Sequence, residues 1–190
     1  FAPDIKEVYD KKVTATSSFF DGLEHEMEGK FRTGHFDGVG TVVKRLFEIV
    51  APNKAYFGEK DFQQLQIIKK MTEKQQLPVK VKGCEIYRET NGLAMSSRNS
   101  RLTQEHKNAA PFIFKTLQKA KIKFGVEDPS TIIKWVEKEF EKQPLLTLEY
   151  FSIADEKTLK NIEKKDKKTQ YRAFIAVFAG EIRLIDNIQI

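Results

Sequence analysis

Residues 55–66 read AYFGEKDFQQLQ, and this stretch decides the fold of the first half of the chain. A short apolar run stops at Gly58, and a helical pattern begins at Asp61. The change in pattern predicts a buried strand over Ala55–Phe57 and a helix over Asp61–Gln76. A strand that feeds a helix through a glycine is the start of an α/β unit.

The segments on either side extend this α/β pattern. Phe36–Val50 predicts a helix that ends before Pro52, and Pro78–Tyr87 predicts a second strand, in which Cys84 is expected to be buried. The order helix, strand, helix, strand favours parallel strands joined by crossover helices. The apolar stripe of the first helix consists of Val39, Val42, Val43, Leu46, Phe47 and Val50.

The pattern changes after Arg98, where helices precede strands. Two helices are predicted first, and three strands with one tight turn follow. This order indicates a small α+β domain, so we place one domain at residues 1–87 and a second at residues 88–190. The expected helices are Thr103–Lys123 and Pro129–Glu141; the expected strands are Thr147–Ala154, Tyr171–Phe178 and Ile182–Ile188, with the turn at Ala179–Glu181.

Composition limits the possible partners. The 190 residues are 40% hydrophobic and 32% charged, with a net charge of +6, which suits phosphate-bearing ligands but also raises nucleic acid as a partner. Lysines alternate with glutamates on most predicted helices, so no basic face forms and nucleic acid is disfavoured. No apolar run has the length of a membrane span, and the opening residues lack a signal-peptide pattern. One cysteine permits no internal disulfide, so we expect a cytoplasmic protein without membrane or nucleic-acid partners.

The tetrad Gly58-Glu59-Lys60-Asp61 lies at the carboxyl end of a predicted strand, where α/β sheets bind ligands. The glycine permits close approach of the backbone, and the following helix offers N–H groups and a positive dipole end. Lys60 would add a cation for phosphate, and Asp61 would accept from ribose hydroxyls. A helix start with solvated charges explains the same four residues.

The segment NGLAMSSRN, residues 91–99, places a methionine, two hydroxyls and an arginine in succession. Ser96 and Ser97 offer hydroxyl donors, and Arg98 offers a fork of N–H donors that matches phosphate oxygens. A serine-rich linker that caps the next helix is the alternative. Because both motifs occur in one chain, we favour a site for a nucleoside triphosphate.

Three blocks carry a family resemblance: FRTGHFDGVGTVV at Phe31–Val43, the 55–66 stretch, and GLAMSSRNSRL at Gly92–Leu102. Together they resemble the pantothenate synthetase (pantoate–β-alanine ligase) family over essentially the whole chain, and the opening FAPDIKEVYD is similar to a family segment. The resemblance implies a Rossmann-like nucleotidyltransferase domain, here incomplete at its N-terminus. A small α+β lid domain with two helices and a three-stranded sheet would follow, in a homodimer.

The reaction that the resemblance implies is the condensation of pantoate with β-alanine, with ATP as co-substrate and Mg²⁺. It would pass through pantoyl adenylate and release AMP and pyrophosphate. Gln64 corresponds to the family's pantoate contact, and His35 either approaches pantoate or only begins a helix. The residues expected to bind ATP are Gly58, Glu59, Lys60, Asp61, Tyr87, Met95, Ser96, Ser97 and Arg98; those expected to act in catalysis are Lys60, Ser96, Ser97 and Arg98.

Two departures from the family pattern keep other interpretations open. Thr33 stands where the family usually has proline. The family's H-x-G-H motif, first strand and second pantoate-binding glutamine are expected before the segment at which this sequence starts. The alternatives are therefore an incomplete, non-catalytic ATP-binding fragment, or a related nucleotidyltransferase that acts on another small acid. Gln64 favours a small hydroxy acid.

Overall fold

The computed structural model describes residues 4, 8 and 20–190 and divides the chain into two compact units, Phe1–Cys84 and Glu85–Ile190. Most of the opening FAPDIKEVYD block lies outside the described residues. The sequence predicts a domain boundary after Tyr87, whereas the structure divides the units after Cys84. Tyr87 therefore belongs to the second unit.

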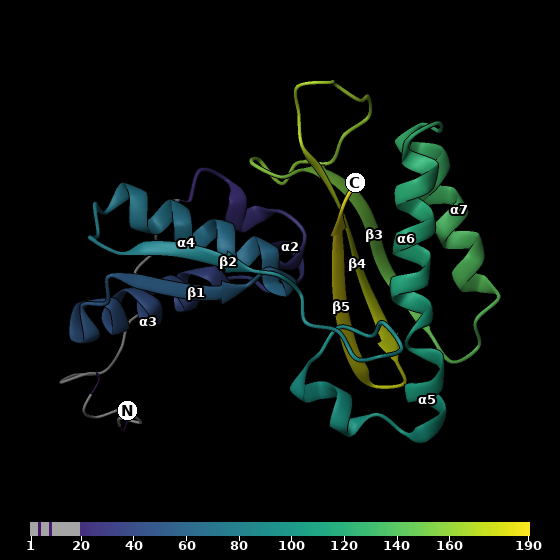
Figure 1. Ribbon diagram of the computed structural model, residues 1–190, viewed down its shortest axis with the longest axis horizontal. Coiled ribbons are helices and arrows are strands. Elements are labelled where there is room, and N and C mark those ends of the chain that lie inside the picture. The colour runs from purple at the N-terminus through teal and green to yellow at the C-terminus, as the bar shows by residue number, and fades with distance from the viewer. Residues whose placement is uncertain (1–3, 5–7, 9–19) are drawn as a thin grey trace. The chain divides into compact units, whose positions relative to one another are not determined.

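The first unit contains the predicted crossover. Strands β1 (Lys54–Gly58) and β2 (Lys80–Cys84) pair in parallel, and helix α4 (Phe62–Lys74) connects them. Figure 1 shows the two strands side by side with α4 along them, and α3 (His35–Val50) packs against α4. The other elements that the structure describes here are η1 (Leu23–His25), α2 (Glu28–Phe31) and η2 (Glu59–Asp61).

Helix α4 supplies more buried side chains than any other element in the described part of this unit. Its apolar residues recur at helical spacing, so they lie on one face, as the sequence predicts. This spacing fixes which face of α4 turns toward the strands and therefore how the preceding tetrad leaves β1. The buried apolar residues of α4 are Phe62, Leu65, Ile67, Ile68 and Met71.

Two predictions of burial in the first unit are wrong. Alternate residues of β1 are exposed, and Tyr56 has 65% of its surface accessible, because the described sheet has two strands and is not covered on both faces. Cys84 is also exposed, because it is the last residue of β2 and lies at the end of this two-stranded sheet. Within the apolar stripe of α3, Phe47 is buried, whereas Val42 and Val50 are exposed.

The second unit is an antiparallel sheet covered by helices. Strands β3 (Thr147–Asp155), β4 (Tyr171–Ala179) and β5 (Ile182–Gln189) follow the order β3-β4-β5, with the predicted tight turn after Ala179. Helices α6 (Phe112–Phe124) and α7 (Pro129–Glu141) pack against the sheet and each other (Figure 1).

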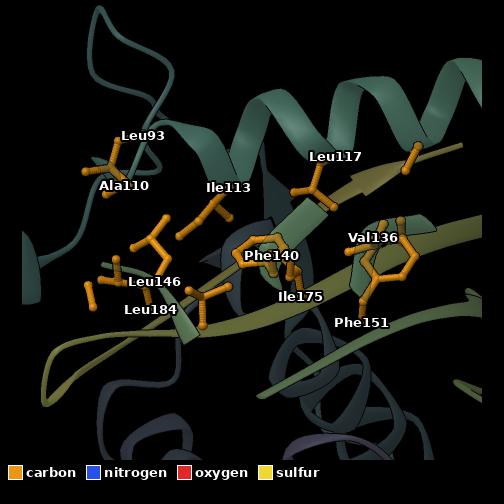
Figure 2. Packing of buried hydrophobic residues seen from close by; sticks show 14 of the residues in the cluster. Leu93, Ala110, Ile113, Leu117, Val136, Phe140, Leu146, Phe151, Ile175 and Leu184 are labelled. Carbon is orange, nitrogen blue, oxygen red and sulfur yellow. The ribbon is translucent and has the colours of Figure 1, made fainter. Parts of the chain in front are cut away.

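The core of this unit lies between these helices and the sheet. Ile113 and Leu117 from α6 meet Val136 and Phe140 from α7 and Ile175 from β4 (Figure 2). Every second residue of β4, from Tyr171 to Ala179, belongs to this cluster, as the period of a strand requires. The α+β arrangement predicted from the sequence is therefore confirmed.

The helix predicted over Thr103–Lys123 is in fact two. Helix α5 (Gln104–Ala109) ends shortly before Pro111, and α6 starts after it, because proline has no N–H to donate to the preceding turn. The predicted start is correct, since the Thr103 hydroxyl accepts the His106 N–H at 3.3 Å. The short helix η3 (Ser97–Arg101) precedes α5. Within residues 4, 8 and 20–190, no helix combines the length and apolar character needed to cross a membrane.

Candidate nucleotide site

The tetrad Gly58–Asp61 is placed by the strand–helix junction. Gly58 is the last residue of β1 and is in register with Cys84, so both strands end at the same edge. Glu59, Lys60 and Asp61 form η2, and α4 starts at the next residue. Because Phe62 and Leu65 are buried, the first turn of α4 is fixed and carries the tetrad with it.

Gly58 is a glycine that the fold itself does not require. Its φ of −67° is open to any residue, and a Cβ atom at this position would meet nothing within 4 Å. Gly83 on β2 differs, because a Cβ there would lie 2.9 Å from the Glu59 carboxylate and 3.0 Å from Leu65. The Glu59 side chain therefore lies over β2, whereas the space beside Gly58 is open to a ligand.

The predicted candidates His35 and Asp61 belong to one electrostatic neighbourhood. Partial burial lowers the pKa of His35 most, and the Arg32 guanidinium lowers it further. The carboxylates of Glu28 and Asp61 oppose these effects by favouring the imidazolium form. His35 is thus biased toward neutral imidazole, which can accept a hydrogen bond from a hydroxyl group.

Two adjacent glutamines on α4 have different environments. Gln63 is buried: its amide donates to the carbonyls of Leu23 and Glu26 at 2.8 and 2.7 Å and accepts the Glu28 N–H at 3.0 Å. Gln64 is half-buried, and its side chain has no hydrogen-bond partner among residues 4, 8 and 20–190. Gln63 therefore holds the polypeptide together, and Gln64 is the glutamine available to a ligand.

The second motif lies on a hairpin in the second unit. The Met95 N–H donates to the Tyr87 carbonyl at 2.9 Å, and Arg88 and Ala94 form an antiparallel bridge. Gly92, with φ of +94°, makes the turn that the sequence indicates. The hairpin thus brings Tyr87 beside Met95, two residues that the sequence assigns to the same nucleotide.

The serines of this motif have separate roles. The Ser96 hydroxyl accepts the Arg98 N–H at 3.2 Å and begins η3, as the capping alternative predicts. Ser97 and Arg98 are exposed, and in the described part of the chain the Arg98 guanidinium has no acidic partner. Met95 and Tyr87 are also exposed, at 55% and 74%. The loop therefore presents a cation, a hydroxyl and two large side chains to solvent.

The predicted site residues are divided between the two units. Gly58–Asp61, Gln64 and His35 belong to the first unit, and Tyr87 and Met95–Arg98 belong to the second. Within each unit the predicted neighbours are brought together. Sequence reasoning assigned no role to four residues that hold the Met95–Arg98 loop: Arg88, Glu89, Asn99 and Asp186. Asn99 lies within the segment NGLAMSSRN, whereas no local sequence signal points to Asp186, which is 98 positions from Arg88.

Comparison with known proteins gives one consistent result. The family model described as pantoate-beta-alanine ligase matches residues 1–189. Pantothenate synthetase of Flavobacterium psychrophilum is 53% identical over 190 residues, which cover all of this chain and 67% of that protein. The protein of the same name from Christiangramia forsetii is 55% identical, and the match covers 99% of this chain and 66% of that protein. The chain thus spans about two thirds of the length of these relatives.

Solved structures agree with the sequence relatives. The crystal structure of pantothenate synthetase from Thermus thermophilus matches with a TM-score of 0.90 and 34% identity, covering 100% of this chain and 68% of that one. A pantoate–β-alanine ligase from Francisella tularensis, crystallised with "Beta-gamma ATP" and β-alanine, matches with a TM-score of 0.75 and 29% identity, covering 97% and 61%.

Proposed function

Because this chain belongs to the pantoate–β-alanine ligase family, we propose that the protein condenses pantoate with β-alanine at the expense of ATP. The family and fold class predicted from the motifs are confirmed by the matches above. In the first step a carboxylate oxygen of pantoate attacks the α-phosphorus of ATP, and pyrophosphate leaves. In the second step the amine of β-alanine attacks the activated carbonyl carbon and loses a proton, and AMP leaves.

The observation that carries this proposal is the exposed Ser97–Arg98 pair on a tethered loop. A guanidinium binds phosphate oxygens in a fork, and such a group aids phosphoryl chemistry when it is held ready before the nucleotide arrives. Arg98 has no acidic partner in the described part of the chain, so it is not neutralised within its unit. Its role is to stabilise the negative charge that develops on the departing pyrophosphate.

The remaining roles are assigned from position. Lys60 supplies a second cation for the phosphates, and Gly58 gives the nucleotide access to the backbone, since nothing fills the space beside it. Asp61 accepts from ribose. The exposed Tyr87 is assigned to the adenine and the exposed Met95 to the loop that receives the phosphates, as the family resemblance implies. The half-buried Gln64 contacts pantoate, and neutral His35 can accept from a pantoate hydroxyl.

The relative from Francisella tularensis supports the choice of substrates, since it was crystallised with an ATP species and β-alanine. We assign Mg²⁺ to the triphosphate of ATP, because this ion is commonly held by substrate phosphates, waters and one or two carboxylates. Residues 4, 8 and 20–190 contain no cluster of three or more metal-binding side chains. We further propose a cytoplasmic homodimer, as the family resemblance implies.

The test is pantoate-dependent exchange of labelled pyrophosphate into ATP, without β-alanine, in the natural protein. Arg98→Ala is expected to lower exchange about 10²–10³-fold, as does the loss of a single charge-stabilising donor elsewhere. Arg101→Ala is the matched control, because Arg101 is also exposed and basic and lies on the same short helix. Lys60→Ala is compared in the same way with Lys69→Ala on α4.

Each outcome separates the alternatives. Exchange that depends on a different hydroxy acid would indicate a related nucleotidyltransferase. ATP binding without any exchange would indicate a non-catalytic protein. Equal rates in Arg98→Ala and Arg101→Ala would remove Arg98 from the site.

A further inference from the structure

The hairpin that carries the Met95–Arg98 loop is joined to strand β5 by a forked ion pair. The Arg88 guanidinium donates to the Asp186 carboxylate through Nη1 at 2.6 Å and Nη2 at 2.9 Å. The arginine side chain is 18% exposed and the aspartate 4%. Two parallel hydrogen bonds fix both the distance and the plane of the guanidinium, so this contact defines where the hairpin lies on the sheet.

The same guanidinium also fixes the tip of the hairpin. Its carbon lies 3.6 Å from the centre of the Phe114 ring on α6, and Nη1 donates to the Gly92 carbonyl at 3.1 Å. A Cβ at Gly92 would lie 2.8 Å from this ring, so the turn is pressed closely against α6. Arg88 therefore contacts the strand, the helix and the turn together, which a lysine cannot reproduce.

A second tether lies on the other side of the loop. The buried Asn99 amide donates to the Glu89 carboxylate at 2.7 Å and to the Ala94 carbonyl at 3.1 Å. Asn99 belongs to η3, and Glu89 and Ala94 belong to the two arms of the hairpin. The segment from Met95 to Arg98 is thus held at both ends while its own side chains stay exposed.

We propose that Arg88 is a positioning residue, which holds the nucleotide-phosphate loop in its binding conformation before ATP arrives. This proposal rests on the assignment of Arg98 to ATP. Holding a loop in advance removes the cost of ordering it on binding, and a misplacement of about 1 Å costs up to about 10²-fold in rate. Loss of the tether is therefore expected to weaken the use of ATP without affecting pantoate, whose proposed contact Gln64 belongs to the first unit.

The experiment compares Arg88→Lys with Arg183→Lys in the natural protein. Arg183 on β5 also makes two contacts with one carboxylate, since its Nε and Nη2 lie 2.8 and 2.6 Å from Glu149 Oε2. It is similarly part-exposed, at 24%, and belongs to the same unit. Both variants keep the positive charge and lose the paired hydrogen bonds of a guanidinium, and the unfolding temperature of each variant is measured beside its kinetics.

Arg88→Lys is expected to reduce kcat/KM for ATP in the exchange assay about 10–100-fold, with the KM for pantoate unchanged. Arg183→Lys is expected to leave both values unchanged. Amide hydrogen exchange of residues 95–101 should be faster in Arg88→Lys than in Arg183→Lys. Asp186→Asn, which weakens the same ion pair from β5, should reproduce the Arg88→Lys pattern and replaces it if Arg88→Lys does not fold.

Equal ATP efficiency in the two lysine variants would overturn the proposal and leave Arg88 a merely structural residue. Unchanged amide exchange in the loop would overturn it as well. If the unaltered protein shows no pantoate-dependent exchange, the proposed function fails, and loop protection still tests the tether on its own.

Discussion

The two units place their site residues in different ways. In the first unit one strand–helix junction positions the tetrad Gly58–Asp61, whose residues are consecutive in the sequence. In the second unit the Met95–Arg98 loop is held by an ion pair between Arg88 and Asp186, which are 98 positions apart. The junction requires only residues that are neighbours in the sequence, whereas the tethered loop requires that strand β5 has already joined the sheet.

The sheets of the two units also differ in how far their strands are buried. Strand β4 is buried along almost its entire length, and a helical layer covers the sheet. Strand β1 alternates between exposed and half-buried residues, although parallel strands are commonly buried on both faces. The second unit therefore carries its own core, and in the described part of the first unit α4 is the largest single contributor of buried side chains.

The largest expected effect is on the free energy of unfolding, when one strand residue from each sheet is replaced by alanine. Ile175→Ala on β4 removes a side chain that is 1% exposed and should lower the free energy of unfolding by about 2–5 kcal/mol. Tyr56→Ala on β1 removes a side chain that is 65% exposed and should change it by less than about 0.5 kcal/mol. Denaturant unfolding measures both changes, and a cost at Tyr56 as large as that at Ile175 would contradict the contrast between the two sheets.

A smaller effect separates the two glutamines of α4. Gln63→Ala leaves the carbonyls of Leu23 and Glu26 without their donor and should lower the free energy of unfolding by about 1–3 kcal/mol. Gln64→Ala should leave stability unchanged and raise the KM for pantoate more than the KM for ATP. Unfolding curves and exchange kinetics on both variants provide the check, and the reverse assignment of the two effects would contradict it.

Two glycines offer a comparison of similar size. Gly92→Ala forces a side chain into a left-handed conformation against the Phe114 ring, and should cost about 1–2 kcal/mol of stability. Gly58→Ala has neither problem and should keep or slightly raise stability, but its new methyl group occupies the space proposed for the nucleotide. Its KM for ATP should therefore rise; an unchanged KM would show that the ligand does not approach Gly58.

The smallest effect concerns pH. Burial and Arg32 hold the pKa of His35 below its usual value of about 6.5, so the unfolded chain binds this proton more readily than the folded one. Stability should therefore fall as the pH drops through about 6.5 toward the lowered pKa, and His35→Asn should lack this part of the loss. NMR titration of the imidazole gives its midpoint, and Arg32→Gln should raise it. A midpoint above 6.5 would refute the environment described for His35.

The sequence predicted most of the elements because their signals are local. The period of α4, the proline at the start of α7 and the tight turn after Ala179 all act within a few residues. The errors arose where the outcome depends on neighbours. Cys84 and Tyr56 lie in segments whose composition is typical of a buried strand, but the number of strands beside them decides their exposure.

The sequence by itself determined the family, the two motifs and the order of the elements, because glycines, prolines and hydrophobic periods constrain the chain within one or two turns. Only the tertiary structure decided that Gln63 is a structural clamp beside an available Gln64, and that Asp186 on β5 holds the loop containing Arg98 through Arg88. These contacts join segments distant along the chain, and their geometry exists only when the sheet and helices have packed.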